Sequence, residues 1–144
     1  MTTRADIVNV ARGYVGTPWH HRARLPGVGL DCAGVLICVC RELGIVAPDF
    51  DVPEYSITPD GSMLEWCDRY MRRITKAEMQ AGDAIVLITD KDPQHLAVLG
   101  DYRGGDQFSI IHGTNDRRYM RVIEMRLMFS RDQRFAAAYA LPGM

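Results

Sequence analysis

The sequence predicts an α+β domain, with helices at the N-terminal end packed on an antiparallel sheet of five to six strands. Two patterns indicate this class. Apolar residues recur at helical spacing in the first half of the chain, and short runs rich in branched and aromatic side chains follow from residue 84 onward. Helices followed by strands, rather than alternating with them, are typical of α+β domains. A chain of 144 residues, 47% of them hydrophobic, is expected to form one domain over residues 1–144.

The first helix is expected over residues 3–15. Its apolar side chains share one helical face and are Ile7, Val8, Ala11, Tyr14 and Val15. Thr3 followed by Asp6 is a weak capping pattern, and Gly16 ends the helix. Residues 16–30 contain two prolines and three glycines without periodicity, so we expect a loop that lines a site.

The second helix is expected to begin at Asp31 or Cys32 and to stop at Gly44. Asp31 is a good N-cap residue, and the helix that follows is apolar over most of its surface. A helix of this kind belongs in the core, where it would cover one face of the sheet.

The rest of the chain contains a long loop, a third helix and the strands. Residues 45–61, broken by three prolines, are a candidate lid over a site. Ser62 and Glu65 form a capping-box pattern that predicts a helix to about Arg73. The expected strands are "AIVLIT", "HLAVLG", "FSIIHG", "YMRVIE" and "FAAAYAL", and the turns "DKDPQ", "DYRGGDQ" and "TNDRR" separate the first four as an antiparallel meander.

Charge and hydropathy exclude two classes of protein. The net charge of -1 and the pI near 6.4 provide no electrostatic footprint for a nucleic-acid backbone. The N-terminal residues lack the apolar run of a secretion signal, and no apolar run approaches the ~20 residues that span a bilayer. We therefore expect a protein made in a cytoplasm, without membrane insertion, that reaches any outside target by another route such as a particle.

The cysteines do not form a predicted metal site. If residues 31–43 are helical, Cys38 lies roughly 240° around the axis from Cys32, and Cys40 lies roughly 12 Å along it. The three thiols cannot share one ion, so Cys38, Cys40 and Cys67 are expected to be small buried apolar residues. We expect no metal and no organic cofactor, with a zinc site of Cys32 and a loop histidine as the alternative.

Cys32 has two readings, a buried thiol in a core helix or a reactive nucleophile. A helix N-terminus favours the thiolate, and its free N–H groups can stabilise an oxyanion. A nucleophile of this kind needs a base, and the base needs a group that orients it. His95 opens one expected strand and His112 closes the next, so both imidazoles could share one face, expected to be the face that the buried helix covers.

Five segments resemble a known motif series. In this order and at these separations, "GTPW", "GLDCAGV", "AGDAIVL", "HLAVL" and "IIHG" resemble the NlpC/P60 cysteine peptidases, which are papain-like cell-wall hydrolases. The resemblance spans roughly residues 5–115. It implies the papain-like NlpC/P60 fold, with Cys32 as nucleophile, His95 as general base and His112 as the group that orients His95. It also implies hydrolysis of an amide bond in the peptidoglycan stem peptide, and it points to the bond between D-glutamate and the following diamino acid.

The loop before Cys32 supplies further candidates for the site. Trp19 stands where the family often has a tyrosine that contributes to the oxyanion site, and its indole N–H can donate a hydrogen bond. Asp31 and His21 are substrate or oxyanion candidates. Arg22 and Arg24 flank the expected cleft and could hold a substrate carboxylate, with solvated loop arginines as the alternative.

The form "HRARLPGVGLDC" more closely resembles the branch of the family encoded in phage tail gene clusters. This resemblance implies a virion tail location, with tail hub or tail-tip proteins as partners and bacterial peptidoglycan as the target. Two rival functions stay open: an amidase or acyltransferase that uses the same Cys-His site, and a catalytically weak structural component of a tail tip. The complete set of Cys32, His95 and His112 argues against the structural rival.

Overall fold

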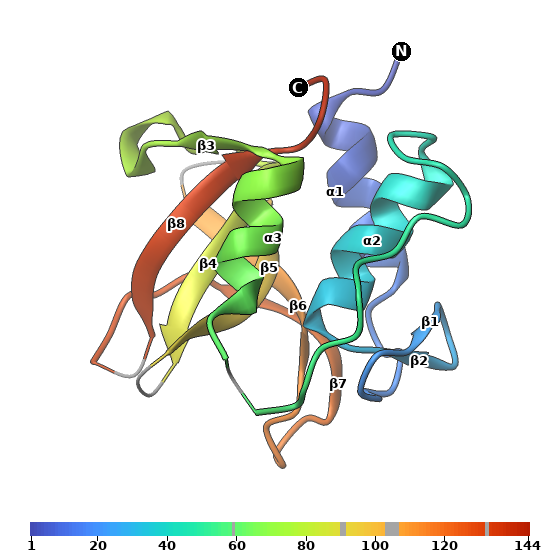
Figure 1. The fold of residues 1–144 in the computed structure, drawn as a ribbon. Coiled ribbons are helices and arrows are strands. Elements are labelled where there is room, and N and C mark those ends of the chain that lie inside the picture. Colours follow the sequence, from blue (N-terminus) through green and yellow to red (C-terminus); the bar gives the residue numbers. More distant parts are fainter. Residues whose placement is uncertain (59, 90–91, 103–106, 132) are drawn as a thin grey trace.

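A computed structural model describes residues 1–58, 60–89, 92–102, 107–131 and 133–144. Three helices pack on a six-stranded antiparallel sheet, which confirms the predicted α+β class (Figure 1). Within these residues, no helix is both long enough and apolar enough to cross a membrane.

The first two helices begin at the predicted caps. Helix α1 (Arg4–Gly13) starts after Thr3, whose side chain and backbone form a capping box with Asp6. Helix α2 (Cys32–Glu42) starts after Asp31, whose carboxylate accepts a hydrogen bond from the Gly34 N–H at 2.8 Å. Both helices contact strand β5 (Asp92–Tyr102), and α2 also contacts β6 (Gln107–Thr114).

Helix α3 (Ser62–Tyr70) differs from its prediction at both ends. The predicted capping box of Ser62 and Glu65 is wrong, because Ser62 is already helical and follows Gly61 in the left-handed conformation. The backbone N–H of Ser62 at the start of the helix donates instead to the Asp60 carboxylate, at 2.9 Å. The helix stops at Tyr70 because the chain becomes extended and forms strand β3 (Arg72–Ile74), which was not predicted.

The sheet has the strand order β3-β8-β4-β5-β6-β7. The predicted meander is confirmed for β4 to β7, whereas the last strand returns to pair with β4. The remaining elements of this sheet and its connections are β4 (Ala84–Thr89), β7 (Arg121–Arg126), β8 (Arg134–Ala140) and the short helix η1 (Lys76–Glu78). Of the predicted turns, residues 90–91 and 103–106 lie outside the described residues.

Both faces of the sheet are buried. On the helix side, a large cluster joins α1 and α2 to sheet residues such as Val86, Val98 and Ile111. On the other face, Leu87, Leu99 and their neighbours form a second cluster, covered by side chains that include those of Phe108, Leu127 and Phe135. Alternation along each strand assigns successive residues to the two clusters.

The segment between α1 and α2 is more ordered than the predicted loop. Strands β1 (Arg24–Leu25) and β2 (Gly29–Leu30) form a small antiparallel hairpin within it. The hairpin leads directly into Asp31, so it delivers the chain to the start of α2 (Figure 1).

Candidate active site

Backbone contacts determine the position of Cys32, the first residue of α2. A Cβ atom at Gly34 would lie 2.5 Å from the Ala23 carbonyl oxygen, so the preceding loop packs directly on the helix. A Cβ atom at Gly113 in β6 would lie 2.9 Å from the Asp31 carbonyl oxygen. Because both positions lack a side chain, the start of α2 is held tightly between the loop and the end of β6.

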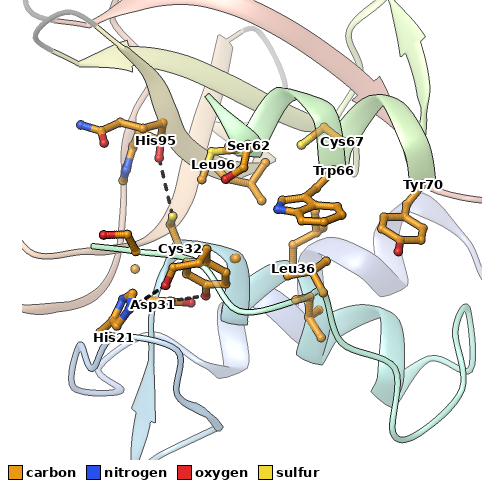
Figure 2. A pocket seen from close by; sticks show the side chains of 18 of the residues that line it. His21, Asp31, Cys32, Leu36, Ser62, Trp66, Cys67, Tyr70, His95 and Leu96 are labelled. Atoms are coloured by element: carbon orange, nitrogen blue, oxygen red, sulfur yellow. Dashed lines mark hydrogen bonds between the residues drawn. The ribbon is translucent and has the colours of Figure 1, made fainter. Parts of the chain in front are cut away.

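The Cys32 thiol lies against the strand segment that carries His95. Its sulfur donates a weak hydrogen bond to the Gln94 carbonyl oxygen at 3.9 Å, and the backbone N–H of Leu96 interacts with it from the other side. Gln94 and Leu96 flank His95 in the chain, and Figure 2 shows the thiol directed toward this segment. Among the described residues, the thiol bonds to this backbone rather than to the imidazole ring.

The two predicted imidazoles contact each other. Nε2 of His95 and Nδ1 of His112 form a hydrogen bond, and the ring centroids lie 4.6 Å apart with the planes at 82°. With Nε2–H of His95 as the donor, Nδ1 of His95 is the nitrogen left to accept a proton. His112 then carries its proton on Nε2, a buried atom that has no partner in the described part of the chain.

The imidazoles lie on the sheet face opposite α2, contrary to the expectation. His95 pairs across the strands with Leu87 of the second cluster and alternates with Leu96 of the helix-side cluster. His112 likewise alternates with Ile111, which is on the helix side. The prediction that α2 covers the imidazole face was therefore wrong. The start of α2 approaches the end of β6 at Gly113, and the Cys32 thiol approaches the backbone of β5 at Gln94.

Burial sets the charge state of the three groups. Burial, followed by the negative charge of Asp31, raises the pKa of Cys32 to about 11. Burial lowers the pKa of His95 to about 4, and burial together with the neighbouring His95 lowers the pKa of His112 to about 3. At neutral pH the site therefore holds a thiol and two neutral imidazoles. Desolvation and the charge of Asp31 both favour the thiol over the thiolate that the helix N-terminus was expected to favour.

Cys32 and His95 open into a cleft of about 360 Å³. Near Cys32 the lining includes Trp19, His21 and Gln94. The cleft then continues between α2, α3 and the segment that follows α2, where its walls are apolar (Figure 2). The candidate nucleophile therefore lies where a substrate can reach it.

Asp31 and Arg24 bind each other beside the cleft. Arg24 Nη1 donates to the Asp31 carboxylate at 2.9 Å, and the Arg22 backbone N–H donates to it at 2.8 Å. The Tyr55 hydroxyl donates to the same carboxylate and accepts from Arg24 Nη2 at 2.7 Å. With Asp31 only 3% exposed, these contacts join the loop, α2 and residue 55 into one polar network. A substrate role for Asp31 or Arg24 would require this network to open.

Trp19, His21 and Arg22 lie around the same network. Trp19 and His21 line the cleft, and His21 Nε2 lies 3.1 Å from the Tyr55 carbonyl oxygen. The Arg22 guanidinium lies 5.0 Å from the centre of the Tyr55 ring, beside rather than in the cleft. Within the described ranges, no three His, Cys, Asp or Glu side chains group closely enough to hold a metal ion.

The other cysteines are buried, as predicted. Cys38, Cys40 and Cys67 are 4 to 6% exposed and unpaired, whereas Cys32 is half-buried. Burial raises the pKa of Cys40 and of Cys67 to about 12. Cys32 is therefore the cysteine that both borders the backbone beside His95 and is partly accessible.

Sequence reasoning missed four contributors to the site. Tyr55 belongs to the proline-broken segment, and no local pattern connects it to Asp31. The contribution of Gln94 is its carbonyl, which any residue would supply. Trp66 is an ordinary helix residue in the sequence, and only the packing of α3 on the sheet beside α2 places it in the cleft wall. Gly113 could have been found, because a glycine directly after His112 marks a close backbone approach.

Comparisons with known proteins identify the fold. No family model matches the sequence, and no curated protein matches it. Among solved structures, the NlpC/p60 domain of the peptidoglycan hydrolase SagA superposes with a TM-score of 0.64 and 20% identity, covering 97% of this chain and 100% of that one. An NlpC/P60 family protein from Bacillus cereus superposes with a TM-score of 0.69 and 20% identity, covering 98% of this chain and 41% of that one. An N-acetylmuramoyl-L-alanine amidase from Bacteroides uniformis superposes with a TM-score of 0.59 and 10% identity, covering 96% of this chain and 98% of that one. The chain therefore has the NlpC/P60 fold.

Proposed function

We propose that the protein is a cysteine peptidase that hydrolyses an amide bond in the stem peptide of bacterial peptidoglycan. One observation carries the proposal: the Cys32 thiol lies against the backbone on both sides of His95, whose Nε2 is bonded to His112. A peptidoglycan hydrolase and a cell-wall amidase among the structural neighbours support the substrate class.

In the proposed reaction, His95 takes the Cys32 proton as the substrate binds. The Nδ1 atom of His95 is free to accept it, because Nε2–H is engaged with His112. Proton transfer is coupled to attack, since both groups are neutral at rest. The imidazolium is transient and is stabilised through its bond to Nδ1 of His112, so His112 acts as a positioning residue.

The sulfur then attacks the carbonyl carbon of the scissile amide. A tetrahedral oxyanion forms near the start of α2, where the Cys32 N–H has no intrahelical partner and can donate to it. His95 returns its proton to the leaving amine, and the C–N bond breaks to give a thioester. Water, deprotonated by His95, attacks the thioester and releases the carboxylic acid and the thiol. Trp19, which lines the cleft, is the candidate for a second oxyanion donor.

The test is digestion of purified sacculi by the wild-type protein and by Cys32→Ala, with released muropeptides identified by mass spectrometry. Wild-type protein is expected to create one new amino and one new carboxyl end, at the bond between D-glutamate and the diamino acid. Cys32→Ala is expected to release none. Cys38→Ala is the matched control, because Cys38 lies on the same helix but does not line the cleft.

The outcomes separate the rival functions. Equal products from wild-type protein and Cys32→Ala would remove Cys32 as the nucleophile. New ends at the bond between muramic acid and L-alanine would identify an amidase. No product from either protein would favour a structural role in a tail tip.

We propose further that the protein acts from a phage tail, with tail hub or tail-tip proteins as partners. The form of the loop "HRARLPGVGLDC" supports this location. Mass spectrometry of purified virions is expected to find the protein in the tail fraction. Its absence from intact tails that carry their tip complex would contradict the location without affecting the peptidase chemistry.

A further inference from the structure

The cleft extends well beyond the reacting groups, as an apolar chamber under α3. Cys32, Leu36 and Cys40 recur every four residues on one face of α2, and all three line the cleft. Eight residues of helix measure ~12 Å, so the chamber follows α2 over roughly that length. Its other walls come from α3 and from the segment after α2, including Phe50, Met63, Trp66 and Tyr70.

Charge argues against an anionic group in the chamber. No lysine or arginine lines the cleft in the described part of the chain, so its walls offer no full positive charge to an occupant. Among the described residues, two carboxylates line the cleft: that of Asp31, which Arg24 neutralises, and that of Asp60, which is exposed and accepts from the Ser62 N–H at the start of α3. The apolar wall along α2 and α3 therefore suits an uncharged, apolar group.

The chamber also contains a free hydrogen-bond donor. Nε1 of Trp66 is buried and has no partner among the described residues, and the indole lies along the wall between Cys32 and Tyr70 (Figure 2).

We propose that this chamber is an acyl-chain subsite, and that the protein also hydrolyses esters and thioesters of medium-length aliphatic acyl groups. The chamber begins at Cys32, so its occupant is the part of the substrate that ends in the reacting carbonyl. The chain lies along Leu36 and Cys40 toward Tyr70, with its carbonyl at Cys32. This second activity rests on Cys32 being the nucleophile of the proposed peptidase.

The chemistry needs no additional reactant except water. Cys32 sulfur bonds to the acyl carbon while its proton passes to His95, and the bond to the alcohol or thiol leaving group breaks. The leaving group either takes that proton from His95 or departs as an anion, in which case His95 releases the proton to solvent. Water then cleaves the acyl-enzyme thioester, giving the fatty acid and restoring the Cys32 thiol.

The first measurement compares hydrolysis of 4-nitrophenyl octanoate with that of 4-nitrophenyl acetate, each at concentrations below micelle formation. Each fully buried methylene contributes roughly fourfold to binding, so burial of about half of the six additional methylenes is expected to make kcat/KM on the order of 100-fold higher for octanoate. Intact mass spectrometry is expected to find the octanoyl group on Cys32. A ratio near one, or a preference for acetate, would overturn the subsite.

Binding of an unreactive amide tests the subsite without requiring the reaction of Cys32. In Cys32→Ala, octanamide is expected to raise the thermal midpoint in a concentration-dependent way, and acetamide is not. Stabilisation by octanamide, with no turnover of either ester by the wild-type protein, would support the subsite and overturn the proposed ester hydrolysis. Equal effects of the two amides would overturn the subsite, whatever the esters show.

Variants of the chamber wall test its location. Met63→Trp fills the chamber and is expected to lower the octanoate-to-acetate ratio at least 10-fold. Met63→Leu keeps a similar apolar volume and is expected to retain the ratio. Leu36→Trp fills the chamber from α2 and provides a second variant if Met63→Trp melts at a much lower temperature than wild type. An unchanged ratio in a folded filling variant would contradict this location.

Discussion

The protonation of Cys32 depends on two local effects of opposite sign. The start of α2 favours the thiolate, whereas burial and the adjacent Asp31 favour the thiol. The thiol form prevails, and His95 and His112 are neutral as well. The resting site therefore differs from a preformed thiolate–imidazolium pair, and the difference is measurable.

Alkylation of Cys32 by iodoacetamide is expected to rise steadily from pH 7 to pH 10. With a thiol pKa of about 11, the thiolate fraction grows about tenfold for each pH unit in this range. Rates measured by peptide mass spectrometry at each pH provide the test, with Cys38, Cys40 and Cys67 as internal controls that react only after unfolding. A rate plateau from pH 5 to pH 8 would instead identify an ion pair.

The bond between the two histidines predicts a graded effect of substitutions at His112. His112→Ala leaves Nε2–H of His95 without its acceptor and is expected to lower kcat/KM on muropeptides by roughly 10- to 1,000-fold. His112→Asn offers a carbonyl oxygen near the position of Nδ1 and is expected to recover part of that loss. Equal kinetics of the two variants, both with a wild-type thermal midpoint, would rule out orientation of His95 as the role of His112.

At the scale of elements, the site depends on how closely the start of α2 approaches β6. Gly113 makes this possible, because its missing side chain leaves room for the Asp31 carbonyl. The polar network of Asp31, Arg24 and Tyr55 holds the same helix end from the loop side. Cys32 thus takes its position from two segments far apart in the chain.

Gly113→Ala is expected to impair the site and to destabilise the fold. The new Cβ atom would lie 2.9 Å from the Asp31 carbonyl, so either α2 or β6 must shift, at a cost of about 1–3 kcal/mol in the free energy of unfolding. Urea unfolding and muropeptide release measure the two effects.

The matched control is Gly13→Ala, because a Cβ atom at Gly13 meets nothing within 4 Å. It lies at the end of α1, and replacement by alanine there is expected to be neutral or slightly stabilising. A Gly113→Ala variant as stable and active as Gly13→Ala would show that the close approach is dispensable.

At the scale of the whole molecule, the core sets the pH range of stability. The sheet is buried on both faces, and the histidine pair lies in that buried environment. A histidine kept neutral by folding has a lower pKa in the native state than in the unfolded chain. The unfolded chain therefore binds more protons below pH 6.5, and stability falls as the pH drops toward the native values of about 4 and 3.

Urea unfolding is expected to show that the free energy of unfolding is lower at pH 4.5 than at pH 7.5. The histidine pair is expected to account for on the order of 1–3 kcal/mol of this difference, a figure reduced to allow for the partial exposure of His95. The double variant His95→Gln/His112→Asn is expected to lose less stability between the two pH values. His20→Asn, at an exposed position, is the control and is expected to behave like wild type. Identical pH dependence in the double variant and wild type would contradict burial of neutral imidazoles.

At alkaline pH the buried cysteines make the stability fall as the pH rises. Cysteine pKa values raised by folding mean that the native state retains protons that the unfolded chain loses, so stability falls as the pH rises above about 9. Maximum stability with respect to these groups is therefore expected between about pH 6.5 and pH 9.

The sequence by itself determined the elements and their order. Asp31 before an apolar run specifies where α2 starts, because capping and helical periodicity are local properties. Alternating branched residues specify the strands of the meander for the same reason. Cys32, His95 and His112 were identified because the order and spacing of their segments resemble a known series.

Only the tertiary structure decided how these parts meet. The sheet face of the imidazoles follows from strand register, and the neutral thiol follows from burial by distant segments. Tyr55 reaches Asp31 only after the long loop has packed against the start of α2, and Trp66 lines the acyl-chain subsite only after α3 has packed on the sheet beside α2. These features depend on contacts between segments remote in sequence, and hydrophobic periodicity says which face of an element is buried but not what buries it.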